Sequence, residues 1–308
     1  MSGEKQLGVA NAAMRIGRDL VLDIFKAWRR DLDCVDALIL LVITMGNVDG
    51  VLFSRKLRRR YGGVSPIAPD DLRQPISSSV IALSLGLPAQ DVRSRILSLA
   101  ERDECEVTPR GMLISQHQLE ATNRTAIVRE VYKLLYRSYE DLKLTGFVAA
   151  IEVSAFERAE VQPVRNAAAH GAKYVLRTLD TLCRRLGDVR NALIFLEVMR
   201  RTGADREDQP APAEPAAPAR IVEVAAALGL SPEAARRRIR GLTSLDLCER
   251  QGVGVVTPAR VHVEPWFAEV RQRNLDNLFQ LFAGLADVGA LADFDASPSV
   301  ATPVGRIV

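Results

Sequence analysis

A segment of about twenty residues occurs twice in this chain, and this duplication limits the possible folds more than any other feature. When Gly86 is aligned with Gly229, a shift of 143 residues, ten of the twenty-two positions that begin at Leu85 are identical. The apolar segment Asp33 to Leu41 matches Asp188 to Leu196 in the same way, at a shift of 155 residues. With 308 residues the chain can form two modest cores, so the sequence predicts two tandem repeats.

Each copy of the segment predicts two short helices joined by a tight turn. The first helix ends at Gly86 or Gly229, because glycine adopts most easily the left-handed conformation that closes a helix. The second helix follows Pro88 in one copy and the Ser231-Pro232 pair, an N-cap and a first-turn proline, in the other. Its apolar residues recur at i, i+4 and i+7 and predict a buried stripe: Val92, Ile96 and Leu99, or Ala235, Ile239 and Leu242.

The residues between the stripe positions are therefore expected to face outward. They are Gln90, Arg93, Ser94 and Leu97 in the first copy, and Glu233, Arg236, Arg237 and Arg240 in the second. Arginine side chains on such a helix can bind guanine edges or phosphates, as a recognition helix in a major groove does. We count Arg95 with Gln90, Arg93 and Ser94 as a candidate DNA contact.

After each helix pair the sequence predicts a β-hairpin, from Cys105 to Ile114 and from Cys248 to Thr257. A helix-turn-helix followed by a hairpin resembles a winged helix. Arg110 and Arg250 then lie near the two wings and are further candidate DNA contacts. Winged helices also serve as protein-interaction modules, and an arginine-rich helix face is often only solvated, so both alternatives stay open.

The first repeat carries a basic cluster in a connector that is about twelve residues longer than its counterpart. The cluster contains Arg55, Lys56, Arg58 and Arg59 and is flanked by Phe53 and Tyr61. These cations can lie along a phosphate backbone or reach into a groove, but they can equally form a solvated loop or surface helix. The second connector, residues 204–219, alternates Pro and Ala and predicts an extended, poorly ordered linker.

Helical spacing of apolar residues before and after each hairpin predicts long flanking helices. We expect a mainly α protein in which two tandem winged-helix repeats with long flanking helices form an intramolecular pseudo-dimer. The predicted divisions are residues 15–145 for the first repeat, 146–172 for a helical connector and 173–286 for the second repeat. Residues 1–14 are expected to be a frayed lead, and 287–308 a disordered, acidic tail.

The segments SLGLPAQDVRSRI and ALGLSPEAARRRI, set between long helices, resemble winged-helix bacterial transcriptional regulators of MarR-like architecture. That resemblance implies a DNA-binding transcriptional regulator whose terminal helices form the dimer interface. Two fused repeats imply a monomer with an internal pseudo-two-fold, or a homodimer of such chains, on an asymmetric bipartite site in double-stranded DNA. A pocket between the terminal helices and the winged helices would suit a small apolar effector.

The sequence gives little support to an enzyme, a cofactor or a metal centre. It contains three histidines, none at metal-ligand spacing with Cys or a carboxylate, and no phosphate-binding glycine loop or nucleophile motif. The longest apolar run, Ala37 to Met45, is too short to span a bilayer, and no signal peptide is evident. Four widely spaced cysteines predict reduced thiols, and we expect a cytoplasmic, nucleoid-associated protein. The alternatives are a tandem winged-helix scaffold and a replication-initiator-like DNA binder.

Overall fold

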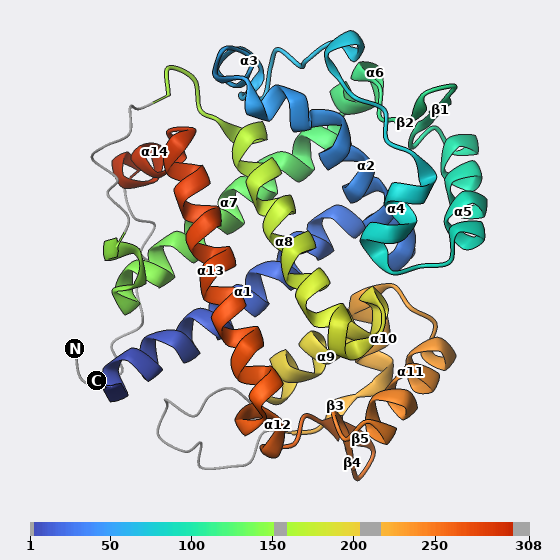
Figure 1. The fold of residues 1–308 in the computed structure, drawn as a ribbon, viewed down its shortest axis with the longest axis vertical. Helices are drawn as coiled ribbons and strands as arrows, with labels where there is room; N and C mark the ends of the chain where they lie inside the picture. Colours follow the sequence, from blue (N-terminus) through green and yellow to red (C-terminus); the bar gives the residue numbers. More distant parts are fainter. Residues whose placement is uncertain (1–2, 151–158, 204–216, 298–308) are drawn as a thin grey trace, which may run out of the picture.

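The computed structural model describes residues 3–150, 159–203 and 217–297, and in these ranges the chain is mainly helical (Figure 1). The first half contains α1 (Gly3–Arg29), α2 (Cys34–Phe53), α3 (Arg55–Tyr61), α4 (Ser78–Leu85), α5 (Ala89–Glu101), β1 (Glu106–Thr108), β2 (Gly111–Leu113), α6 (Gln116–Glu120) and α7 (Thr122–Thr145). The second half contains α8 (Val164–Leu186), α9 (Val189–Thr202), β3 (Ala219–Arg220), α10 (Ile221–Leu228), α11 (Pro232–Ser244), β4 (Glu249–Gln251), β5 (Gly254–Val256), α12 (Arg260–Val263), α13 (Pro265–Asp287) and α14 (Ala290–Ala296). Short 3-10 helices lie at Asp70–Leu72 and Phe147–Ala150.

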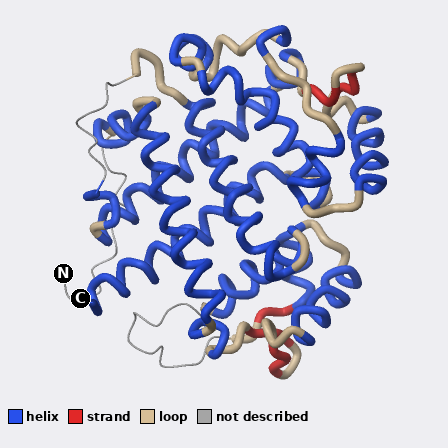
Figure 2. The backbone as a smooth tube through the Cα atoms, in the orientation of Figure 1, coloured by secondary structure: helices blue, strands red, loops and turns tan. Residues whose placement is uncertain are grey.

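The two halves share one order of elements: two helices, a short helix pair, a β-hairpin, a short helix and a long helix. The 143-residue shift places α4 on α10, α5 on α11 and α7 on α13, while α3 has no counterpart among the described residues. Figure 2 shows the two hairpins at opposite ends of one side of the molecule. The duplication read from the sequence is therefore a duplication of local structure.

The long helices of both halves pack together and form the body of the molecule. Helices α1, α7, α8 and α13 pack against one another (Figure 1). Gly17 of α1 lies where this helix crosses α8 and α13, and its lack of a side chain lets the three helices approach closely. At this crossing the Tyr174 hydroxyl donates to Asn274 Oδ1 at 2.8 Å. Tyr174 is fully buried, so this hydrogen bond satisfies a polar group in the middle of the core.

Helix α2 is long and apolar enough to span a membrane by length and composition, although the apolar run in the sequence is shorter. In the fold, 67% of its apolar window is buried by other parts of the chain. A core helix that is surrounded by protein needs apolar residues around most of its circumference, which accounts for its composition.

The chain that precedes each short helix pair also pairs with the second strand of the hairpin, as a third strand in the second half and as a single bridge in the first. β3 pairs with β5 through Ala219 and Val255, and Ile76 forms the equivalent isolated bridge with Met112. A Cβ at Gly111 would lie 2.7 Å from the Ile76 carbonyl oxygen, and one at Gly254 would lie 2.6 Å from Pro218. Both positions therefore need glycine for close approach of the backbones.

Three predicted divisions of the chain are wrong. Residues 3–14 are not a frayed lead, because α1 begins at Gly3 and buries Ala13 and Met14. The boundary at residue 172 falls inside α8, where Gly171 lets α1 and α7 pack closely. Residues 151–158 of the expected connector, and 204–216 of the expected linker, lie outside the described residues.

The expected disordered tail is the third error, because it begins with an ordered helix. In α14, Leu291 and Phe294 are almost completely buried. Its acidic residues are not simply solvated: Asp293 accepts from Tyr132 at 2.5 Å, and Asp295 accepts from Tyr139 at 3.0 Å. Residues 298–308 lie outside the described part of the chain.

Candidate nucleic-acid interface

Two helix pairs, α4–α5 and α10–α11, lie along one edge of the molecule (Figure 1). As predicted, Gly86 and Gly229 end the first helix of each pair in the left-handed conformation, with φ of 61° and 65°. The Ser231 hydroxyl accepts from the Ala234 amide at 3.2 Å and caps α11. In the first copy Pro88 holds the N-cap position and no side chain caps the helix.

The buried and exposed faces of α5 and α11 follow the predicted spacing. The two apolar stripes are buried, with exposures of 3% or less: Val92, Ile96 and Leu99 on α5, and Ala235, Ile239 and Leu242 on α11. The exposed residues include Gln90, Arg93, Ser94, Arg236, Arg237 and Arg240. These six side chains are therefore available for contact with another molecule.

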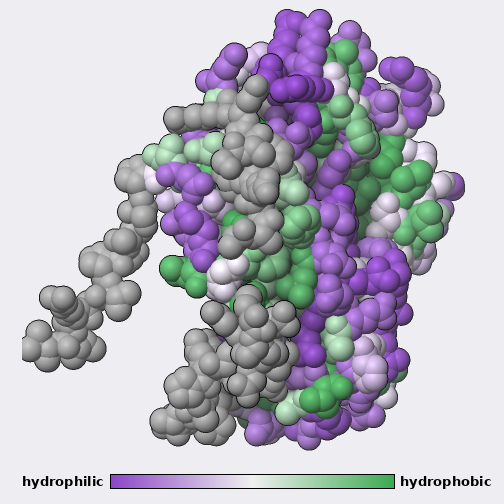
Figure 3. Space-filling model, turned by 60° about the vertical axis from the view of Figure 1, so that its left-hand side comes forward, coloured by the Kyte–Doolittle hydropathy of each residue, from purple (hydrophilic) through white to green (hydrophobic). Residues whose placement is uncertain are grey.

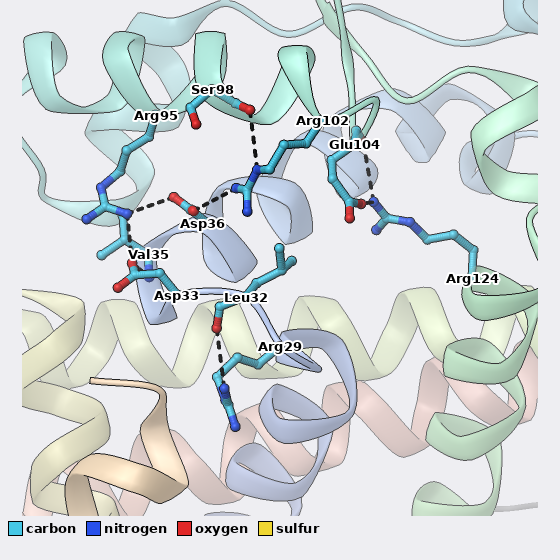
Figure 4. A network of polar contacts seen from close by, with 10 residues as sticks. All are labelled: Arg29, Leu32, Asp33, Val35, Asp36, Arg95, Ser98, Arg102, Glu104 and Arg124. Atoms are coloured by element: carbon cyan, nitrogen blue, oxygen red, sulfur yellow. Dashed lines mark hydrogen bonds and ion pairs between the residues drawn. The ribbon is translucent and has the colours of Figure 1, made fainter. Parts of the chain in front are cut away.

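Arg95 is the exception, and its assignment as a DNA contact is not supported by its position. Its guanidinium turns inward and donates to Asp33 Oδ1 and Asp36 Oδ1, both at 2.7 Å (Figure 4). Arg102 binds the other oxygen of Asp36 at 3.0 Å. Because Arg95 follows Val92 by three residues, it lies beside the buried stripe, where a carboxylate partner stabilises its charge.

An equivalent interaction exists in the second half and was not foreseen. Arg238 donates to Asp188 Oδ2 at 2.7 Å and to Asn191 Oδ1 at 2.9 Å. Asp188 also caps α9 by accepting from the Arg190 and Asn191 amides. The signal was present in the internal alignment, where Arg95 matches Arg238 and Asp33 matches Asp188.

Each helix pair also approaches the opposite half of the molecule. A Cβ at Gly86 would lie 3.8 Å from the Gly187 carbonyl oxygen, at the corner between α8 and α9. A Cβ at Gly229 would lie 3.1 Å from the Leu32 carbonyl oxygen, at the corner between α1 and α2. These reciprocal contacts, together with the two ion pairs, fix the spacing of α5 and α11.

The two exposed faces differ in chemistry. On α11, Arg236, Arg237 and Arg240 form a basic surface, in which Arg236 makes a loose ion pair with Glu233 at 3.9 Å. The α4–α5 pair is less basic and has exposed apolar side chains, with Leu83 84% exposed and Leu97 58% exposed.

The hairpin arginines occupy different positions. Arg110 lies in the two-residue turn between β1 and β2, whereas Arg250 lies on strand β4. Both side chains are exposed. Only Arg110 is therefore at the tip of a hairpin.

The basic cluster of residues 55–60 does not adjoin the helix pairs. Figure 1 places α3 at the top of the molecule, beyond the end of α2, while α5 and α11 lie along the right-hand edge. Hydrophilic residues dominate this top end in Figure 3. Arg58 is engaged in an ion pair with Asp287, and Arg55, Lys56 and Arg59 are exposed. The cluster thus forms a short surface helix, α3, which is one of the two forms expected from the sequence, and it lies away from α5 because the twenty-residue helix α2 separates them. Its contact with a phosphate backbone stays a prediction.

The described residues contain no group of three or more His, Cys, Asp or Glu side chains arranged to hold a metal ion. All four cysteines are free. Burial raises the pKa of Cys105 to about 11 and that of Cys248 to about 12, which keeps both thiols protonated and poorly reactive.

Comparison of the chain with models of protein families, with curated proteins and with solved structures found no match.

Proposed function

We propose that this protein is a DNA-binding transcriptional regulator that reads an asymmetric, bipartite site with two winged helices of one chain. In this proposal α5 and α11 are the recognition helices, and the β1–β2 and β4–β5 hairpins are the wings. The long helices α1, α7, α8 and α13 take the place of a dimer interface, so that one chain presents both readers.

The exposed arginine face of α11 is the observation that carries the proposal. Arg236, Arg237 and Arg240 project from a helix whose opposite face is fixed in the core by Ile239 and Leu242. A rigid, basic helix at a molecular edge is suited to a major groove, where guanidinium groups bind guanine O6 and N7 or phosphates. On α5, Arg93 with Gln90 and Ser94 would read a second, different half-site.

The contacts between the two halves support simultaneous binding by both helices. The reciprocal contacts at Gly86 and Gly229 hold the helix pairs in one arrangement along the same edge. Two readers fixed in this way would contact half-sites about one turn of DNA apart, on the order of 34 Å.

The test is retention of fragmented genomic DNA by the purified chain at two salt concentrations, followed by sequencing. We expect a bipartite, asymmetric motif in the wild type and its loss after Arg236→Ala, Arg237→Ala and Arg240→Ala. A matched control removes three charges from α3, with Arg55→Ala, Lys56→Ala and Arg59→Ala, and should retain the motif. Equal loss in both variants would indicate general phosphate attraction and contradict sequence-specific reading by α11.

A protein-interaction scaffold is the second candidate, and the exposed apolar side chains Leu83 and Leu97 favour it. Under this alternative, DNA retention is weak in the wild type as well as in both variants. Phosphate binding is steeply salt-sensitive, so retention that is weak at low salt as well would favour the scaffold.

A further inference from the structure

A cavity of about 70 Å³ lies in the first half of the molecule, between α1, α2, α7 and the start of α8. It has room for on the order of five water molecules. Most of its lining is apolar, including Val48, Leu52, Ile127 and Val128, and it also contains Trp28, Arg73, Arg124 and Arg165. The site lies away from the exposed faces of α5 and α11 and has no part in the proposed DNA contacts.

The polar groups of the lining are mostly hydrogen-bond donors. The Trp28 indole nitrogen is buried and has no hydrogen-bond partner among the described residues. Arg165 donates to the backbone oxygens of Val64 at 3.0 Å and Leu119 at 3.3 Å. The exposed Glu120 carboxylate acts on Arg165 electrostatically, but the two make no ion pair within 4 Å. A buried donor without a partner is costly, so its presence beside a cavity indicates a group that accepts hydrogen bonds there.

The positive charge of the lining is also poorly compensated. Arg73 is 1% exposed, and its hydrogen bonds go to the Ala68 and Ile114 backbone oxygens. Its nearest carboxylate, on Asp70, is half-exposed and lies 3.9 Å away. Burial lowers the pKa of Arg73 to about 10, and that of Arg165 is lowered for the same reason. Arg124, by contrast, is neutralised by Glu104 at 2.5 Å.

The second half of the molecule does not reproduce this chemistry. The 143-residue shift places Phe267 where the first half has Arg124, and the 155-residue shift places Cys183 where it has Trp28. Phe267 is 1% exposed and packs against His262 with ring centroids 5.0 Å apart. The segment that supplies Ile67, Ala68 and Arg73 belongs to the longer first connector. The first half therefore has a cavity rich in hydrogen-bond donors, whereas the second half has an aromatic cluster at the equivalent place.

We propose that the cavity in the first half binds one small monocarboxylate with a short apolar body. The carboxylate balances the charge of Arg73 and Arg165, and the apolar body contacts residues such as Val48 and Ile127. A purely apolar ligand, as expected from the sequence, adds nothing to the partial compensation that the exposed carboxylates of Asp70 and Glu120 give to Arg73 and Arg165. Inorganic anions leave the apolar walls without a partner. This inference concerns ligand binding alone and does not rest on the proposed reading of DNA.

The test is thermal unfolding of the full chain with straight-chain carboxylates from propanoate to octanoate, and with benzoate, each at 10 mM. Each acid is compared with its own neutral amide, and sodium chloride is matched for ionic strength. At least one carboxylate should raise the Tm by about 2 °C or more, with a smaller effect from its amide and none from chloride. Equal shifts with acid and amide, or no shift with any acid, would overturn the proposal.

A filling variant locates the site. Thr44 lies in the cavity wall, and the second half has Met199 at the equivalent position. Thr44→Met should therefore fill the cavity and abolish the rise in Tm caused by the carboxylate. Thr181→Met, on the surface of α8, is the matched control and should keep it. A carboxylate shift that survives in folded Thr44→Met would place the binding elsewhere and reject this cavity. If Thr44→Met does not fold, Arg165→Gln replaces it, and an acid effect no larger than the amide effect is then expected.

Discussion

The Arg238 guanidinium donates to the Asp188 carboxylate at 2.7 Å and connects the exposed helix α11 to the corner between α8 and α9. In the first half Arg95 makes the same connection to Asp33, also at 2.7 Å. The two ion pairs show that both helix pairs are anchored by the same device. Whatever binds α5 and α11 therefore acts on helices that are held to the core at matching points.

The two anchors differ in burial, and this predicts unequal stability effects. The Arg238 and Asp188 side chains are 17% and 21% exposed, against 34% and 39% for Arg95 and Asp33. Arg95 also binds Asp36, which is 12% exposed, but Arg102 pairs with the same carboxylate and stays in place when Arg95 is removed. We expect Arg238→Met to lower the free energy of unfolding by about 2 kcal/mol and Arg95→Met by about 1 kcal/mol, because solvent weakens the exposed pair and Asp36 keeps a partner. Urea unfolding of both variants measures the difference. A larger loss for Arg95→Met would contradict this ranking.

Gly17 marks the place where α1 crosses two other helices, and a methyl group there has no space. A Cβ at Gly17 would lie 2.4 Å from the Tyr174 hydroxyl and 2.9 Å from the Asn274 amide. We expect Gly17→Ala to lower the free energy of unfolding by about 1–3 kcal/mol, since overpacking separates the helices.

Gly8→Ala is the matched control on the same helix. A Cβ at Gly8 would meet nothing within 4 Å, and alanine favours a helix over glycine by about 1 kcal/mol. Unfolding of Gly8→Ala should therefore need as much urea as the wild type or slightly more. Equal destabilisation by both substitutions would mean that the crossing is looser than described.

Much of the local structure was predictable, because it depends on patterns that short segments contain. The glycine termini at Gly86 and Gly229, and the exposed arginines of α11, follow from spacing and from backbone preference. The disorder of the tail was predicted wrongly because five of the seven residues of α14 are acidic or small, so its short apolar pattern is hard to see in the sequence. Leu291 and Phe294 make that pattern, and its burial depends on tyrosines more than 150 residues earlier.

The candidate site was predictable only in part, for a related reason. Spacing distinguishes inward from outward faces, but Arg95 lies at the edge between them, and its direction depends on Asp33 and Asp36 from another helix. The position of the basic cluster depends on the length and direction of α2. The donors around the cavity, such as Arg73 and Arg165, lie far apart in sequence and form no motif.

Phe294 tests the ordered part of the C-terminal region. It is 2% exposed, and its ring lies 5.0 Å from that of Tyr132 and 5.7 Å from that of Tyr139. Phe294→Ala should lower the free energy of unfolding by about 3–5 kcal/mol, because it leaves a cavity among aromatic rings. The control is Phe279→Ala on α13, where the ring is 48% exposed and the loss should be below about 1 kcal/mol. Similar, small losses would show that α14 does not pack as described.

His170 makes stability depend on pH. Burial, together with the cations of Lys173 and Arg58, lowers the pKa of this imidazole to about 4. The unfolded chain binds the proton near pH 6.5, so stability that is present above pH 6.5 is lost as the pH falls toward 4.

The measurement is the urea midpoint of wild type and His170→Gln at pH 7.5, 5.5 and 4.5. Other groups contribute to both curves, so only the difference between them reports on His170. We expect the wild type to lose about 1–3 kcal/mol more than the variant across this range. Parallel curves would contradict a neutral His170 in the folded chain.

The proposed DNA recognition predicts that one half-site can be converted into the other. The 143-residue shift matches Ser94 with Arg237, Leu97 with Arg240 and Gln90 with Glu233, while Arg93 already matches Arg236. All three differing side chains of α5 are exposed, so Gln90→Glu, Ser94→Arg and Leu97→Arg together should leave the core intact. A triple variant therefore presents nearly the same exposed residues on both helices.

Selection from random duplexes, with sequencing of the retained pool, reads out the result. The wild type should select two unlike half-sites, whereas the triple variant should select two like half-sites and bind the original site more weakly. Each lost base contact costs about 1–3 kcal/mol, so the expected fall in affinity is roughly tenfold or more. A control with Ser98→Arg and Glu101→Arg adds charge to the C-terminal end of α5 and should strengthen binding without changing the motif. If the triple variant and this control select the same unlike half-sites, α5 does not read base sequence, and the two-reader proposal fails while reading by α11 alone still stands.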